Sequence, residues 1–329
     1  PAAAKKGETR LKVLQLNVWH QTKKVSNGME GLVGIIDQTD PDIVLLCELE
    51  RGDRQFIASL VGELGKRGKT YYPDSQYMNV GVLSKYKPIR TQAMIRPEET
   101  DRAIVKAHFD INGHAVAVYS AHLDYKHYEC YLPRGYSGTT WKKIDKPVVD
   151  PDSILAANRL SNRDEAISFL IADASGEIGN DNLVIIGGDF NEPSHLDWQE
   201  DTRNLYDHNG AVVNWDCSVM LAKAGYKDAY RQKYPSAVLH PGFTFPAGNK
   251  DAVLKDLVWA PEADERDRID FIYYHPNRKV RLEDAFIVGP SQSVAHGQFV
   301  ESPSGEAIIE PTGVWPTDHK GNLVVFRIR

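Results

Sequence analysis

Short apolar segments separated by polar loops make up most of this chain. Eight of these segments are rich in β-branched and aromatic side chains and predict strands at residues 11–18, 43–46, 80–83, 104–109, 115–120, 183–186, 269–274 and 323–328. Four stretches with helical periodicity predict helices at residues 28–39, 54–65, 154–174 and 218–224. Because these helices cannot all be crossovers between strands, the order predicts an α+β fold of two packed sheets covered by helices.

Three long stretches interrupt this pattern, at residues 125–151, 195–215 and 286–315. Loops of this length are uncommon in compact domains unless they are functional or disordered. The first stretch is rich in aromatic and basic side chains, which would suit a wall that contacts a substrate. A surface loop held together by its own aromatic residues is an equally good interpretation.

Polar residues recur inside or just beyond the ends of the apolar segments. They are Asn17, Glu48, His122, Asp189, Asp270, Asp318 and His319. A charged group at such a place is expected to be partly buried, where it needs a partner, a proton or a metal ion. Neighbouring strands could bring all of these side chains to one edge of the sheets.

Each of these residues also has an ordinary interpretation when it is taken alone. Asn17 could satisfy backbone groups at a strand end, and His122 could be a hydrogen-bonded histidine of the core. Asp189 and Asn191 could simply form an Asx turn, because Gly-Asp and Asn-Glu-Pro are common in turns. Several accidents at equivalent strand ends are less plausible than one shared site, so the set as a whole favours a functional centre.

The acidic members of this set predict the kind of metal that the site would bind. Glu48, Asp189 and Asp318, with Asn17 nearby, form an all-oxygen set of the type that Mg²⁺ or Mn²⁺ prefers, with zinc as the second choice. His122 and His319 are then better used as donors to a negatively charged oxygen of a substrate.

Seven segments, in this order, resemble the endonuclease/exonuclease/phosphatase superfamily, which has the deoxyribonuclease-I-like fold. They are LQLNVW (14–19), DIVLLCE (42–48), NVGVLSKYKPI (79–89), YSAHLDY (119–125), IIGGDFNEP (185–193), DRIDFIYY (267–274) and TDHKGNLVV (317–325). The combination of GDFN with a late DH pair is specific, although each motif alone is weak. The resemblance implies a four-layered α/β/β/α sandwich with two central mixed, mostly antiparallel sheets. We expect one catalytic domain at residues 11–329 after a tail at residues 1–10.

The resemblance also implies a metal-dependent phosphoester hydrolase. It makes Glu48 the principal metal ligand, with Asn17 and Asp318 near the same ion or a second one. Asp189 would orient or deprotonate the attacking water, and Asn191 would hold a phosphate oxygen. Whether one or two metals take part, and which group is the base, stays open.

The histidines take the remaining catalytic roles that the resemblance implies. His122 would stabilise the developing charge or assist the leaving group. His319, oriented by Asp270, would contact the scissile phosphate. The family's usual Gln before the metal-binding Glu is Cys47 here, which leaves the carboxylate of Glu48 in place.

Four further residues are candidate substrate contacts. Arg102, Asn158 and Arg159 are expected near the phosphate, because the family often has basic or amide groups in these regions. Asp124 follows the histidine segment and could support the site, although a solvent-facing strand end is an equal alternative.

Composition narrows the choice of substrate and partner. The net charge of −6 argues against a protein that grips long nucleic acids, because such affinity comes from Lys and Arg that neutralise phosphates. Nuclease activity is not excluded, since a metal ion or a local basic patch can dominate an acidic background. No apolar run is long enough to span a membrane. We expect a monomer. The sequence starts at Pro1 without an initiator Met, which is consistent with removal of a signal peptide or with a trimmed chain, and of these we favour export.

The cysteines add little chemistry. Cys47, Cys130 and Cys217 have no CxxC spacing, which argues against a zinc site or a disulfide framework and leaves room for one bridge.

Three functions remain to be distinguished. The favoured one is hydrolysis of a small-molecule or lipid-linked phosphoester. The second is a magnesium-dependent nuclease with the same mechanism. The third is a catalytically silent module that binds a phosphorylated ligand, which the complete set of hydrolytic residues argues against.

Overall fold

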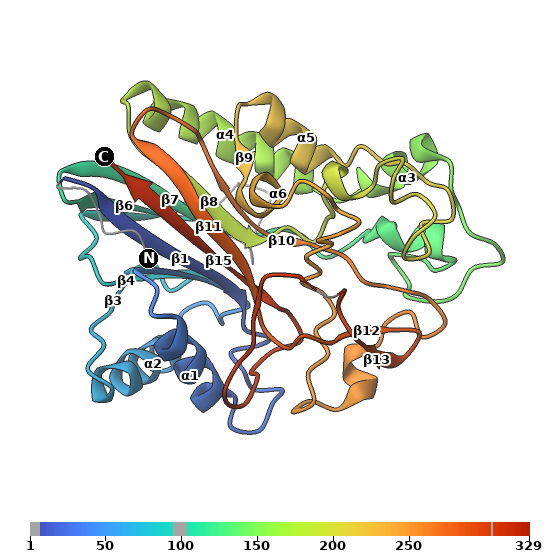
Figure 1. The fold of residues 1–329 in the computed structure, drawn as a ribbon, viewed down its shortest axis with the longest axis horizontal. Helices are drawn as coiled ribbons and strands as arrows, with labels where there is room; N and C mark the ends of the chain where they lie inside the picture. Colours follow the sequence, from blue (N-terminus) through green and yellow to red (C-terminus); the bar gives the residue numbers. More distant parts are fainter. Residues whose placement is uncertain (1–6, 95–103, 304) are drawn as a thin grey trace.

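Two β-sheets stacked face to face form the centre of the molecule (Figure 1). The structure is a computed structural model that describes residues 7–94, 104–303 and 305–329. The first sheet has the order β14 (Ile308–Ile309), β11 (Val280–Val288), β15 (Gly321–Ile328), β1 (Thr9–Asn17), β2 (Ile43–Cys47), β4 (Val80–Ser84) and β3 (Tyr72–Pro73). The second has the order β5 (Arg90–Met94), β6 (Ile104–Ile111), β7 (His114–His122), β8 (Leu183–Asp189), β10 (Asp270–Tyr274) and β9 (Lys227–Asp228).

Both sheets are mixed and mostly antiparallel. The pairs β1–β2, β7–β8 and β11–β14 are parallel, and the other pairs within the two sheets are antiparallel. Side chains such as Val13, Leu45, Val118 and Ile185 fill the space between the sheets. Strands with two covered faces need apolar residues at nearly every position, which explains the continuous apolar runs in the sequence.

Helices cover the outer faces of the two sheets. Helices α1 (Gly28–Thr39) and α2 (Arg54–Lys66) pack against the first sheet, below it in Figure 1. Helices α4 (Arg163–Gly179) and α5 (Asp216–Lys223) pack against the second sheet, above it in the same view. The four-layered α/β/β/α sandwich is therefore confirmed.

The remaining elements are shorter. They are α3 (Pro151–Asn158), α6 (Ala229–Lys233), the hairpin β12 (Ser293–Ala295) and β13 (Gln298–Val300), and the 3-10 turns at Glu129–Arg134, His195–Asp197 and Leu254–Leu257. Among the residues that the structure describes, none of the helices has the length and apolar character that a membrane crossing requires.

Two sequence-based expectations about these elements are wrong. The helix expected at residues 154–174 is interrupted after Asn158 and restarts at Arg163. The interruption lets Ser161 donate a hydrogen bond to Asp124 at 3.0 Å and lets Arg163 point into the interior. The loop expected at residues 286–315 contains the end of β11 and all of β12, β13 and β14, strands of two or three residues that are too short to show a period.

The stretch of residues 125–151 is anchored to the rest of the protein. Its buried Tyr128 and Tyr131 share an apolar cluster with Trp198 and Trp215. Its buried Arg134 forms an ion pair with Asp267, three residues before β10 begins at Asp270. All three cysteines are buried and free, so the one bridge left open does not form.

Candidate active site

The polar strand ends meet at one end of the two sheets. His122 pairs in register with Asp189, and Asp189 pairs with Asp270, so β7, β8 and β10 present these three side chains in one row. Asn17 ends β1 of the other sheet and pairs with the last residue of β2, directly before Glu48. The predicted convergence of these residues is therefore seen in the structure.

Gly188 is needed for the close approach of β7 and β8 at this end. A Cβ atom at Gly188 would lie 1.9 Å from the carbonyl oxygen of Ala121, a distance that no side chain can adopt. The glycine thus keeps Asp189 in register with His122.

A cavity of about 690 Å³ opens over this row. Among the predicted residues, its lining includes Glu48, His122, Asp189, Asn191, Asp318 and His319. Asn17 and Asp270 are fully buried behind this lining. The predicted catalytic and metal-binding residues thus divide into those that face the cavity and those that lie behind them.

Asn17 connects the carboxylates of the two sheets. Its side-chain nitrogen donates to Oε1 of Glu48 at 3.1 Å and to Oδ2 of Asp189 at 2.9 Å. Its side-chain oxygen accepts from the backbone nitrogen of Trp19 at 2.9 Å. In this orientation Asn17 presents a donor to the two carboxylates, which fits a residue that orients Glu48 and Asp189 better than one whose oxygen binds a metal.

Glu48 is exposed to the cavity and carries a negative charge. Burial would raise its pKa, but the positive fields of His122 and His319 and the hydrogen bond from Asn17 outweigh burial and lower the pKa below its usual value. Its other oxygen, Oε2, accepts from the backbone nitrogen of His20 at 2.9 Å. Both oxygens therefore have fixed directions.

The backbone around Glu48 and Trp19 adopts a conformation that the sequence did not predict. Trp19, His20, Gln21 and Thr22 have φ angles of 41°, 51°, 56° and 63°, and Glu48 has a φ of 62°. Left-handed conformations cost roughly 1–3 kcal/mol for a non-glycine residue and persist where surrounding contacts fix them. This turn brings Trp19 and His20 to the cavity lining. Neither was a candidate, because nothing in the periodicity marks a left-handed turn.

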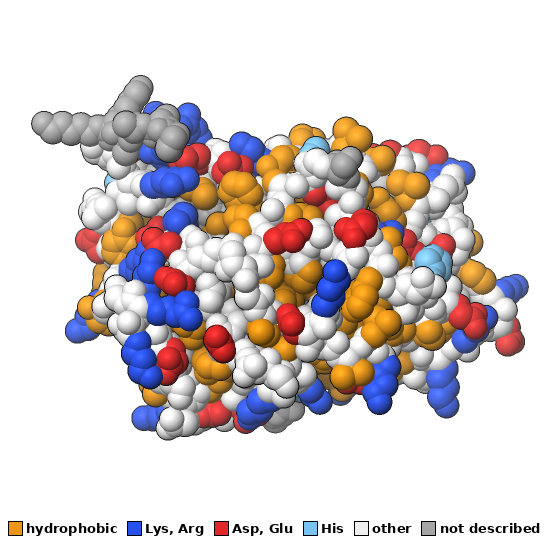
Figure 2. Space-filling model, turned by 60° about the horizontal axis from the view of Figure 1, so that its bottom comes forward, with side chains coloured by type: hydrophobic (Ala, Val, Ile, Leu, Met, Phe, Trp, Pro, Cys, Tyr) orange, Lys and Arg blue, Asp and Glu red, His pale blue; other side chains and the backbone are white. Residues whose placement is uncertain are grey.

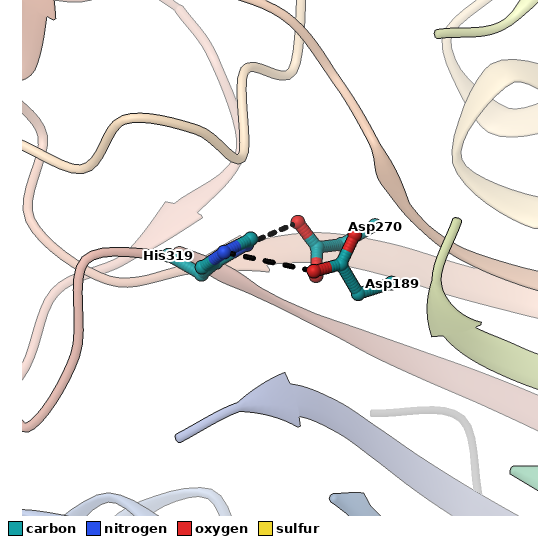
Figure 3. A group of neighbouring side chains, drawn as sticks. All are labelled: Asp189, Asp270 and His319. Atoms are coloured by element: carbon teal, nitrogen blue, oxygen red, sulfur yellow. Dashed lines mark hydrogen bonds and ion pairs between the residues drawn. The ribbon is translucent and has the colours of Figure 1, made fainter. Parts of the chain in front are cut away.

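Asp189, Asp270 and His319 form a buried group joined by one hydrogen bond and one ion pair (Figure 3). Nδ1 of His319 lies 2.8 Å from Oδ2 of Asp270, and Nε2 lies 3.6 Å from Oδ2 of Asp189. Gln15 donates to the other oxygen of Asp270 at 3.2 Å. The imidazole is thus held between two carboxylates, as expected for a histidine oriented by Asp270.

These contacts set the protonation of the group. Burial would lower the pKa of His319, but Asp270, Asp189 and Asp318 together raise it well above its ordinary value. Burial would raise the pKa of Asp189, but His319, His122 and the backbone of Asn191 hold it well below its usual range. Both shifts favour an imidazolium beside an ionised Asp189.

Asn191 forms the predicted turn and also faces the cavity. Its backbone nitrogen donates to Oδ1 of Asp189 at 2.9 Å, and its side-chain nitrogen donates to the carbonyl oxygen of Leu123 at 2.9 Å. The same nitrogen lies 3.3 Å from Nε2 of His122, which is itself 3.5 Å from Oδ2 of Asp189. Asp189 and Asn191 therefore form an Asx turn and also line the cavity, so the two interpretations are compatible.

The donor groups at this end fit a hard divalent cation. Burial raises the pKa of Asp318 to about 7; His319 opposes this rise and the negative charge of Glu48 adds to it. Carboxylates crowded in this way are stabilised by a bound cation, and oxygen is the donor that Mg²⁺ and Mn²⁺ prefer. Glu48 and Asp318 supply such oxygens at the cavity surface.

Asp189, Asp270 and His319 also lie close enough to hold an ion, with ligand atoms within 4.8 Å of one another. A histidine must be neutral to bind a metal. Because the two aspartates favour the protonated form of His319, and Glu48 and Asp318 line the cavity, we consider these last two carboxylates the better metal ligands.

The predicted substrate contacts lie elsewhere. Asn158 is buried and donates to Glu192 at 2.7 Å, while Arg159 forms two hydrogen bonds with Asp216 at 2.8 and 2.9 Å. Asp124 accepts from Ser161. None of these three lines the described part of the cavity, and Arg102 lies outside the described residues. The polar groups of Asn158, Arg159 and Asp124 bond other parts of the chain, which the sequence could not reveal.

Comparisons with known proteins agree with this architecture. TDP2 from D. rerio, solved with a single-strand DNA product, is 16% identical with a TM-score of 0.55 over 97% of this chain and 99% of that chain. Truncated TDP2 from Caenorhabditis elegans is 17% identical with a TM-score of 0.53 over 96% and 97%. The human Nocturnin catalytic domain with bound sulfate is 14% identical with a TM-score of 0.53 over 97% and 95%. These likenesses establish the fold.

Sequence comparison extends the match to a family. "Uncharacterized protein F14F9.5" of Caenorhabditis elegans is 26% identical over 274 residues, which cover 80% of this chain and 78% of that protein. The model of the Endonuclease/Exonuclease/phosphatase family matches residues 14–319, from the strand that carries Asn17 to His319 itself. This chain therefore belongs to the Endonuclease/Exonuclease/phosphatase family.

Proposed function

We propose that this protein is a divalent-metal-dependent phosphoester hydrolase that acts on a small-molecule or lipid-linked phosphoester. Its family includes metal-dependent phosphoesterases and nucleases. The observation that carries the proposal is the link that Asn17 makes between Glu48 and Asp189 at the floor of one cavity. This link holds Glu48, the proposed metal ligand, beside Asp189, the carboxylate that we propose orients the attacking water.

The residues of this chain divide the hydrolytic work. Asp189, ionised and fixed by Asn17 and Asn191, orients the attacking water and accepts its proton. Asn191 and the imidazolium of His319 contact phosphate oxygens and stabilise the charge that develops on them. Asp270 keeps His319 protonated and directed at the cavity.

His122 has a separate role near the leaving group. It lines the cavity beside Asp189 and Asn191. Its position suits stabilisation of developing charge or assistance to the departing oxygen.

Glu48 and Asp318 would hold Mg²⁺ or Mn²⁺, with zinc as the second choice. When bound, the ion supplies positive charge that neutralises the phosphate oxygens. Asn17 contributes by directing one oxygen of Glu48, and the backbone of His20 directs the other.

Charge distribution supports a small phosphoester over a nucleic acid strand. Among the described residues that line the cavity, Arg51 is the single Lys or Arg, against Glu48, Glu50, Asp189 and Asp318. Figure 2 shows acidic and basic side chains interspersed over the face that is turned forward. A strand of nucleic acid is usually held by a continuous series of basic contacts.

The test is a substrate screen with Mg²⁺, Mn²⁺ and Ca²⁺ added separately. Phosphomonoesters, phosphodiesters, sphingomyelin-like lipids, plasmid and single-stranded DNA are each incubated with the wild type and with Asp189→Asn. We expect metal-dependent hydrolysis of a small phosphoester that falls by roughly 10²-fold or more in the variant.

Three other outcomes would replace the proposal. Cleavage of DNA alone would make the protein a nuclease. No hydrolysis, together with no calorimetric signal for Mg²⁺ or Mn²⁺, would favour the silent binding module. Full activity of Asp189→Asn would show that the assignment of the catalytic carboxylate is wrong.

A further inference from the structure

The apolar part of the cavity lining is almost entirely aromatic. Among the eighteen described residues that line the cavity, seven are Trp, Tyr or Phe and only Leu49 is aliphatic, whereas aromatic residues make up 9% of the chain. We call five of these seven the aromatic wall, namely Tyr125, Tyr128, Tyr131, Trp141 and Trp259. A pocket built for an acyl chain would be lined by aliphatic side chains, so this lining favours a ring-bearing ligand.

Four rings of the wall, those of Tyr128, Tyr131, Trp141 and Trp259, contact one another in a chain. The ring centroids of Tyr128 and Tyr131 are 4.9 Å apart, those of Tyr131 and Trp141 are 5.8 Å apart, and those of Trp141 and Trp259 are 5.5 Å apart. Rings at these distances leave no gap among themselves for a cation to enter. They form one packed aromatic cluster, with edge-to-face or tilted rings, and its exposed members can contact a ligand ring.

Two rings of the wall are partly exposed at the surface. Tyr125 and Trp259 are 49% and 44% exposed, which is unusual for large aromatic side chains. Tyr128 and Tyr131, between the ends in the chain, are buried and fix the base of the wall. A rigid base with exposed rings is the arrangement expected of a binding surface.

A buried carboxylate joins the two segments that make the wall. Glu265 is fully buried and accepts from the hydroxyl of Tyr131 at 2.9 Å. The same carboxylate accepts from the backbone nitrogens of Trp259 at 3.2 Å and Ala260 at 3.0 Å. The position of Trp259 is therefore tied to the stretch of residues 125–151.

A second buried group fixes the wall relative to the hydrolytic residues. The guanidinium of Arg163 is buried and donates to the carbonyl oxygens of Asp124, Lys126 and His127 at 2.8, 2.6 and 2.7 Å. It also lies 3.5 Å from Glu192, the residue after Asn191. The segment that begins the wall and the loop that carries Asn191 thus share one support.

We propose that the aromatic wall binds the organic group of the substrate by ring stacking, and that the substrate is a phosphoester carrying a planar ring, either a nucleobase or an aryl group. This inference rests on the proposed phosphoester hydrolase function and names the substrate class of the same cavity. The phosphate lies over His319 and Asn191, and the ring lies against Tyr125, Trp141 and Trp259.

The central comparison is between two esters that differ mainly in the planarity of the ring. Benzyl phosphate and cyclohexylmethyl phosphate have the same kind of leaving oxygen and similar apolar size, and adenosine 5′-monophosphate adds a nucleobase. KM and kcat are measured for the wild type, Trp259→Leu and Trp259→Phe. Phe169→Leu is the control, because Phe169 is exposed on α4 and does not line the cavity.

We expect Trp259→Leu to raise KM for the ring-bearing esters by about 5-fold to 100-fold, the range typical of lost base–aromatic stacking. KM for cyclohexylmethyl phosphate should change far less, kcat should stay near the wild-type value, and Trp259→Phe should restore most of the loss. The ester whose KM rises more in Trp259→Leu shows whether the wall is suited to an aryl group, as in benzyl phosphate, or to a nucleobase, as in adenosine 5′-monophosphate. Equal changes for planar and non-planar esters, or none, would overturn the inference.

A binding measurement separates this inference from the proposed function. Tryptophan fluorescence of Asp189→Asn is titrated with adenosine 5′-monophosphate and with benzyl phosphate. Quenching that disappears in Asp189→Asn/Trp259→Leu would support the wall even if the wild type hydrolyses nothing. Hydrolysis by the wild type without such a difference would sustain the function and refute the wall.

Discussion

The side-chain nitrogen of Asn17 lies 2.9 Å from Oδ2 of Asp189 and joins the last residue of β1 in one sheet to the last residue of β8 in the other. The same nitrogen reaches Glu48, directly after β2. One neutral amide thus sets the separation of two carboxylates that would otherwise repel each other. The consequences of this and of three other arrangements can be measured.

Replacing Asn17 should weaken both catalysis and metal binding. Asn17→Ala removes the donor shared by Glu48 and Asp189, so we expect activity and Mn²⁺ affinity to fall by about 10- to 100-fold. Steady-state kinetics over a Mn²⁺ titration would measure both effects. Asn112→Ala is the control, because Asn112 bonds Thr9 at the opposite end of the sheets. Wild-type Mn²⁺ affinity in Asn17→Ala would contradict the role of this amide.

Asp270→Asn tests the orientation of His319. The substitution keeps the size of the side chain but removes the charge that holds the imidazolium of His319, and kcat should fall by roughly 10²-fold or more. The control is Asp110→Asn, because Asp110 is exposed and its carboxylate accepts a hydrogen bond from the backbone nitrogen of Gly113. Thermal unfolding of both variants shows whether the loss is catalytic. A kcat for Asp270→Asn equal to that of the wild type would mean that His319 needs no partner.

Arg163 and Arg159 should differ strongly in their effect on stability, although only three residues separate them. Arg163→Met leaves Glu192 as a buried charge without this partner, so we expect the free energy of unfolding to fall by about 3–5 kcal/mol. The half-exposed Arg159 pairs with Asp216, and Arg159→Met should cost less than about 1 kcal/mol. Urea unfolding measures both values. Equal losses would refute the burial argument.

The lowered pKa of Glu177 predicts that the free energy of unfolding falls at acid pH. Burial would raise its pKa, but Lys106, Asn182 and His108 lower the pKa from 4.5 to about 2. A carboxylate with a lowered pKa stabilises the fold above its unfolded pKa, and this contribution is lost as pH falls towards its folded pKa. Between pH 4.5 and pH 2 the wild type should therefore lose up to about 3 kcal/mol more than Glu177→Gln. Urea unfolding at several pH values tests this, and parallel pH curves for the two proteins would exclude it.

Much of the fold and the site could be predicted because strand ends are visible in the sequence. His122 and Asp189 each follow a continuous apolar run, and register pairing places them side by side. The turn at Asp189 and Asn191 is likewise local chemistry. Such features depend on a few neighbouring residues.

Features that depend on distant partners could not be predicted. The left-handed turn at His20 is fixed by Glu48, and the break before Arg163 serves carbonyl groups more than thirty residues earlier. Asn158 was expected at the phosphate, but its amide satisfies Glu192 instead. The sequence shows which side chains are polar, and only the tertiary structure shows what each one contacts.

Arg163 connects two parts of the site that depend on different features of the chain, the hydrolytic residues and the aromatic wall. The groups assigned to hydrolysis lie at strand ends, whose positions follow from the pairing of the sheets. The aromatic wall lies mainly on the stretch of residues 125–151, which is attached at a few buried points, including Arg163 and Arg134. Substitutions within that stretch can therefore change which substrate is bound without moving the hydrolytic residues. Proteins that share this scaffold can then differ in substrate specificity and keep one catalytic mechanism.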